Sequence, residues 1–246
     1  FIHVWKIRKY HKHLLPGRTH EIESRRVEKS LALVLAHDDR PLTEERSLEK
    51  KLIIDCRHFA VLLCTLLRHQ GIPARVRCGF AIYLEKSHYQ DHWVAEYWDT
   101  NQERWILEDP DLVKHDVPRD EFITAGKAWQ MVRSGQISDL QFGYGPDMLG
   151  EWAIRFDLTR DLASINGFEG LSGDAWGMMD KAEPVVTTKD RKLLDEAAAW
   201  SLADNSKFEA MRSFYEANDL FRVPTIINSH NYLIGKNTKV NLDDKG

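Results

Sequence analysis

Residues 55–76 read DCRHFAVLLCTLLRHQGIPARV, and this stretch decides the fold. The part from 56 to 70 is apolar around most of a helical surface, which predicts a buried helix. Asp55 stands where an N-cap residue belongs, and Gly71 is placed to end the helix. A thiol, that of Cys56, therefore opens a buried helix, where the helix dipole and free N–H groups favour a thiolate.

Three strand candidates follow this helix, and apolar residues recur at every second position in the first of them. They span residues 74–84, 91–98 and 105–108. A buried helix followed by an antiparallel meander is typical of an α+β fold. Apolar residues at helical spacing predict further helices at 21–36, 122–133, 148–165, 191–202 and 208–220. The polar tail from 236 to 246 is expected to fray.

The composition excludes several classes of protein. The 246 residues hold 34 Lys and Arg against 38 Asp and Glu, a net charge of −4, so we expect no nucleic-acid partner. With 43% hydrophobic residues the chain can form a core. Three cysteines, an odd number, exclude a disulfide framework as the main stabiliser. No run of about 18 apolar residues and no signal-peptide pattern is seen, so we expect no membrane association and a cytoplasmic location.

A thiol nucleophile needs an imidazole partner, and the imidazole needs a group that orients it. His92 opens the second predicted strand, and Asp109 directly follows the third. If these strands are antiparallel neighbours, His92 and Asp109 lie close together and face the tip of the Cys56 helix. The residue pattern alone leaves the alternative open that Cys56 is an inert core thiol, which is the commoner fate of a buried cysteine.

Three blocks of sequence resemble the transglutaminase-like superfamily of papain-like fold, and they occur in the family's order. The first is the cysteine that opens the helix, with the segment LLRHQGIPARV at 66–76. The second is Gly79-Phe80 and a histidine with a glutamate four residues later, matched by His92 and Glu96. The third is a W-x-x-x-D-P pattern, matched by Trp105, Asp109 and Pro110. The resemblance spans about residues 50–111, and the flanks resemble a bacterial group of transglutaminase-domain proteins.

The resemblance implies a catalytic triad of Cys56, His92 and Asp109. It implies an α+β, papain-like core at 1–117 with N-terminal helices and the cysteine-bearing helix packed on an antiparallel sheet. Residues 118–246 are then a helical C-terminal region packed on that core. The thiolate would attack an amide or thioester of a small molecule or peptide. Hydrolysis is the leading expectation, and the alternatives are an amide synthase or acyltransferase of transglutaminase type and a non-catalytic binding module. This chemistry requires no metal and no cofactor, and the sequence does not set the oligomeric state.

Tryptophans are expected to line the substrate cleft. Trp93 and Trp105 flank the predicted triad, and Trp5 is the one upstream tryptophan that could supply a second oxyanion donor. The other two thiols, Cys64 on the helix and Cys78 on the first strand, are interpreted as core packing.

Overall fold

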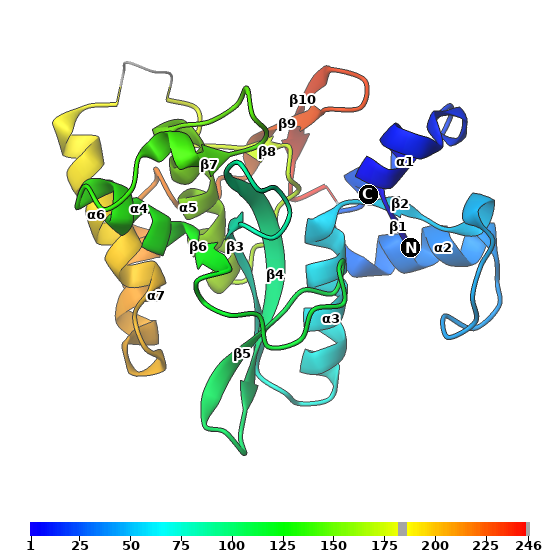
Figure 1. Cartoon of the computed structure of the whole chain (residues 1–246), viewed down its shortest axis with the longest axis horizontal. Coiled ribbons are helices and arrows are strands. Elements are labelled where there is room, and N and C mark those ends of the chain that lie inside the picture. The colour runs from blue at the N-terminus through cyan, green and yellow to red at the C-terminus, as the bar shows by residue number, and fades with distance from the viewer. Residues whose placement is uncertain (182–185, 245–246) are drawn as a thin grey trace.

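The computed structural model describes residues 1–181 and 186–244. At its centre lies a five-stranded sheet (Figure 1). Four strands run in the order β5-β4-β3-β6, each antiparallel to its neighbour, and β7 pairs with β4 in parallel. Their bounds are β3 Ala74–Ala81, β4 Tyr89–Asp99, β5 Arg104–Glu108, β6 Phe122–Thr124 and β7 Phe142–Gly143.

The cysteine-bearing helix α3 (Cys56–His69) packs against β3 and β4 (Figure 1). Its apolar face contacts Val76 and Trp93 of these strands. Two further helices lie beyond it, α1 (Val4–Tyr10) and α2 (Val27–His37). The short strand β1 (Ile2–His3) pairs in parallel with β2 (Ile53–Ile54), which brings the first residues of the chain beside the start of α3.

The helices of the second half of the chain lie to the left of the main sheet in Figure 1, whereas its last strands lie at the top. Helix α5 (Glu151–Ile165) packs on β3 and is contacted by α4 (Ala125–Arg133) and α6 (Thr188–Ser201). Helix α7 (Phe208–Ala217) adds Met211 and Tyr215 to the same apolar core. Short 3-10 turns occupy Lys12–Leu14, Glu21–Glu23, Leu48–Lys50, Asp139–Gln141 and Asn205–Lys207.

A second, three-stranded sheet joins β8 (Asp174–Ala175), β9 (Ile226–Asn231) and β10 (Lys236–Asn241) in the order β10-β9-β8. The prediction that the tail from 236 frays is wrong up to Asn241, because β10 forms a six-residue antiparallel ladder with β9. Residues 245–246 of that tail lie outside the described residues. The C-terminal region is therefore not purely helical.

The α+β class, the buried helix and the antiparallel meander are confirmed. The predicted helix at 122–133 is in part a strand, since β6 precedes α4, and the one at 21–36 begins only at Val27. Because β6 pairs with β3, the main sheet continues past residue 117, and the division into 1–117 and 118–246 stays a prediction. In the part of the chain that the structure describes, no helix is both long and apolar enough to cross a membrane.

Candidate active site

The sheet brings His92 and Asp109 together. Residues Ala95 of β4 and Glu108 of β5 are paired, so Asp109, directly after β5, lies beside the start of β4. His92 Nε2 is 2.8 Å from Asp109 Oδ2, and both side chains are buried. This contact holds the imidazole by one nitrogen and leaves Nδ1 as the nitrogen that could exchange a proton with a nucleophile.

Every lone-pair direction of the Asp109 carboxylate is used. Its Oδ2 also accepts a hydrogen bond of 3.0 Å from the Tyr83 hydroxyl, and its Oδ1 accepts from the backbone N–H groups of Asp111 and Leu112. Burial raises the pKa of Asp109, but the hydrogen bonds from His92, Leu112 and Tyr83 together hold it below its usual value. The carboxylate is therefore ionised and fixed in one orientation.

Cys56 is the first residue of α3, and Asp55 is its N-cap. The thiol is 7% exposed and packs against Trp93, the residue after His92, whose backbone hydrogen-bonds to the sulfur. Among residues 1–181 and 186–244, no hydrogen bond joins Cys56 to His92 itself. The structure thus brings all three expected residues into one region and links two of them directly.

The electrostatics of Cys56 differ from the expectation of a thiolate. Burial raises the pKa of the Cys56 thiol well above its usual value, and the charges of Asp55, Asp91 and Asp111 raise it further. The helix N-terminus is outweighed because the thiol is desolvated and surrounded by carboxylates. In this arrangement the resting form is the protonated thiol.

The cap of the cysteine helix is held by residues from the far end of the chain. Asp55 Oδ2 accepts hydrogen bonds from Ser172 (2.8 Å) and Tyr232 (3.3 Å), and Oδ1 lies 2.6 Å from His58 Nδ1. Burial raises the pKa of Asp55, yet its contacts with His58 and Ser172 outweigh this and keep the pKa well below its usual value. The C-terminal region therefore helps to set the position at which α3 begins.

Two side chains near the dyad were not expected from the sequence. The Tyr83 ring meets the His92 ring edge-on at a centroid distance of 6.1 Å, besides its bond to Asp109. His3 Nε2 lies 3.6 Å from Asp111 Oδ2. Tyr83 lies inside the strand predicted at 74–84, but β3 ends at Ala81, so the strand pattern does not place it. His3 arrives through the long-range β1–β2 pairing, and no local signal marks it.

The three tryptophans expected in a cleft lie in different places. Trp93 is buried in the core against Cys56, whereas Trp5 is 53% exposed on α1. Trp105 stacks edge-on with Trp98 at the other end of β5, four residues or roughly 13 Å along the strand from Asp109. The structure does not bring Trp105 to the thiol.

Glu96, the glutamate of the second sequence block, has a structural role. It is 1% exposed and receives ion pairs from Arg75, Arg77 and Arg119. Burial raises its pKa, but the three arginines outweigh this and lower it to about 2. Arg77 in turn forms two hydrogen bonds with Asp161 of α5, so this network ties the sheet to the C-terminal helices.

Comparisons with known proteins fit this geometry. Residues 36–110 match the model of the transglutaminase-like superfamily, a segment that contains β2, α3, β3, β4, β5 and all three expected site residues. No curated protein is similar enough to count as a match.

A solved structure, described as "a Putative Cysteine Protease from Cytophaga hutchinsonii", is 21% identical to this chain, with a TM-score of 0.25. The similarity covers 46% of this chain and only 40% of that one, and it carries no argument about this site. The family match alone supports a cysteine-dependent enzyme at the level of the superfamily. The segment that holds Cys56, His92 and Asp109 is thus the part of the chain that is similar to the transglutaminase-like superfamily.

Proposed function

We propose that this protein is a cysteine-dependent acyl-transfer enzyme that cleaves amide-type bonds through Cys56, His92 and Asp109. The observation that carries the proposal is the buried His92–Asp109 pair at 2.8 Å, placed on the strand against which the Cys56 thiol packs. A buried imidazole held by an ionised carboxylate next to a thiol at a helix N-terminus is the arrangement that nucleophilic catalysis needs.

The reaction would begin with transfer of the Cys56 proton to His92 Nδ1 while the sulfur attacks the substrate carbonyl. The carbonyl oxygen becomes negative, and the backbone N–H of Cys56, the first residue of α3, would donate a hydrogen bond to it. Collapse of the tetrahedral intermediate expels the amine or thiol, which takes the proton from His92. The product of this half-reaction is an acyl-thioester on Cys56.

The second half-reaction restores the thiol. Water, or an amine in a transferase, gives a proton to His92 Nδ1 and attacks the thioester carbonyl, and Cys56 leaves and recovers that proton. Asp109 stabilises the imidazolium in both halves and stays ionised, because its pKa is held low. Since the pKa of Cys56 is raised, proton transfer to His92 has to accompany attack and does not precede it.

The test is to trap the acyl-enzyme on the intact chain. We would incubate the protein with a panel of peptidyl p-nitroanilides and S-phenyl thioesters and measure intact mass, then map the adduct by peptide mass. We expect an acyl group on Cys56, no adduct in Cys56→Ser, and an unchanged adduct in the matched control Cys64→Ala, whose thiol is buried in the same helix.

A second arm separates hydrolysis from transfer. Glycine ethyl ester added to the trapped enzyme gives an amide product if an amine is accepted, whereas water alone gives the free acid. An adduct that forms equally in Cys56→Ser would refute the assignment of the nucleophile. A folded parent chain that forms no adduct with any member of the panel would favour a non-catalytic module.

A further inference from the structure

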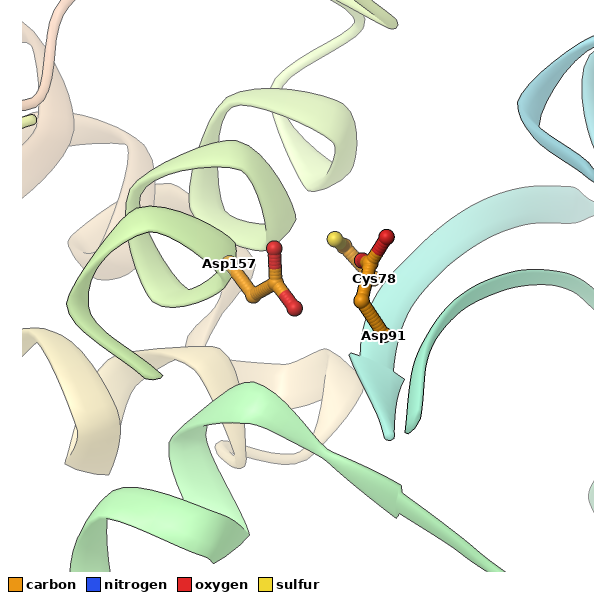
Figure 2. Close-up of side chains that lie close together, drawn as sticks. All are labelled: Cys78, Asp91 and Asp157. Atoms are coloured by element: carbon orange, nitrogen blue, oxygen red, sulfur yellow. The ribbon is translucent and has the colours of Figure 1, made fainter. Parts of the chain in front are cut away.

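A second group of reactive side chains lies outside the His92–Asp109 pair. Cys78 of β3, Asp91 of β4 and Asp157 of α5 point toward one another (Figure 2). One ligand atom from each, the sulfur and two carboxylate oxygens, lies within 4.8 Å of the other two. Cys78 and Asp157 are buried, and Asp91 as a whole residue is half-buried, although its Oδ1 atom is buried.

The fold brings these residues together from three elements. Phe80 pairs with Asp91, and Cys78 lies two residues before Phe80, so Cys78 and Asp91 are diagonal neighbours on one face of the sheet. Helix α5 packs on β3 and turns Asp157 toward them. Each residue sits on a regular element, which gives a ligand site its precision.

The carboxylates have oxygens without a partner. Asp157 Oδ1 accepts a 2.7 Å hydrogen bond from the Tyr144 hydroxyl and lies 3.4 Å from Arg160 Nη1. Asp157 Oδ2 and Asp91 Oδ1 are buried and have no hydrogen-bond donor among the described residues outside the cluster. Within the cluster, Asp157 interacts with the Cys78 thiol and with the Asp91 carboxyl group. Asp157 is fully buried, and an unpartnered carboxylate oxygen there is unfavourable unless a proton or a cation lies beside it.

We propose that Cys78, Asp91 and Asp157 form a binding site for a divalent cation, with Zn²⁺ as the preferred ion. One thiolate and two carboxylates are ligands that zinc accepts. Tetrahedral zinc holds such atoms about 3.4–3.6 Å from one another, so closing from the present arrangement needs side-chain shifts of about 1 Å at most. Three protein ligands leave a fourth position for water.

The local charge fits a divalent ion. The three ionised ligands and Arg160 together carry −2, which one divalent cation neutralises. Binding releases the proton of the Cys78 thiol and the proton that the two carboxyl groups share. Burial and the neighbouring Asp157 raise the pKa of Asp91. In the ion-free cluster, a proton on Asp91 therefore reduces the repulsion between the two carboxylates. A proton shared by Asp91 and Asp157 thus competes with the divalent cation for this site.

The test uses the full chain with Cys56→Ser, so that the thiol of the proposed active site cannot bind the metal. We would titrate this protein with Co²⁺ and follow the thiolate-to-cobalt charge-transfer band, then displace the cobalt with Zn²⁺. We expect one ion per chain, a band that Cys78→Ser abolishes, and zinc affinity that falls roughly tenfold or more in Asp91→Asn. Circular dichroism checks that each variant is folded.

Cys64→Ala is the matched control, because its thiol is buried in α3 and lies outside the cluster. It should bind cobalt with an unchanged band. A folded parent without any band would overturn the proposal and leave the shared proton as the occupant. A band that survives Cys78→Ser would place the metal elsewhere. Neither result depends on whether Cys56 is catalytic, so this proposal can fail while the proposed function stands.

Discussion

Asp109→Asn should disable the enzyme while preserving its shape. Oδ1 of Asp109 accepts from two backbone N–H groups, those of Asp111 and Leu112, which cannot be turned around. The amide oxygen of an asparagine must therefore take the Oδ1 position, and its NH₂ group faces His92 Nε2. Because an NH₂ group only donates, Nε2 has to accept, and the imidazole proton moves to Nδ1.

The wrong tautomer cannot take the thiol proton. We expect the rate of Cys56 acylation to fall on the order of 10³–10⁴-fold, the size of effect seen when a triad histidine is held in the wrong tautomer. This corresponds to about 4–5.5 kcal/mol in activation free energy. The measurements are stopped-flow acylation with a chromogenic thioester and ¹⁵N NMR of the His92 ring.

The matched control is Asp116→Asn, which changes an exposed carboxylate of the same loop that pairs with Arg104. It should leave acylation unchanged. An Asp109→Asn protein that acylates within tenfold of the parent, or whose His92 ring keeps its proton on Nε2, would show that the orientation derived from the backbone donors is wrong.

Tyr83→Phe removes one of four hydrogen bonds to Asp109. Acylation should therefore slow about fivefold, which is about 1 kcal/mol in activation free energy. A larger loss in kcat would mean that Tyr83 contacts the substrate. Because the pKa of Cys56 is raised, its alkylation by iodoacetamide should accelerate steadily as pH rises from 7 to 9, and a plateau already present at pH 7 would contradict a protonated resting thiol. Glu96 has a depressed pKa of about 2, so its ion pairs stabilise the fold fully above its ordinary pKa of 4.5 and are lost as pH falls from 4.5 toward 2. Glu96→Gln should lower the free energy of unfolding at pH 7 by about 3 kcal/mol and make that free energy less dependent on acid pH. Urea melts of the variant and the parent at pH 7 and pH 3 measure this. If the variant is destabilised by the same amount at both pH values, the reasoning is wrong.

The local elements around the site could be predicted from sequence because each carries its own pattern. The helix predicted at 56–70 is Cys56–His69, and the first strand starts at Ala74 as its alternation indicates. Order along the chain suggested His92 and Asp109 as neighbours in an antiparallel meander, and the resemblance to the transglutaminase-like superfamily selected them.

What could not be predicted depends on contacts between distant segments. Strands β1, β2, β7 and β8 have two residues each, too short to show a period, and they exist through their partners. Tyr83 and His3 reach the site by such routes. The expectation of a Cys56 thiolate is wrong because the helix end is a local feature. Burial, the largest cause of the raised pKa, and the charges of Asp91 and Asp111 come from the packing of other elements.

The cap of the cysteine helix has a consequence for the order of folding. Asp55 is bonded to Ser172 and Tyr232, which follow it by 117 and 177 residues. Contacts of such sequence separation form late and slow the folding of a domain. During synthesis the surroundings of the Cys56 thiol are therefore incomplete until Tyr232 has emerged. We expect a nascent chain that stops short of Tyr232 to lack one of the hydrogen bonds that hold the cap of α3, so that the nucleophile proposed at Cys56 would not yet be in its final surroundings.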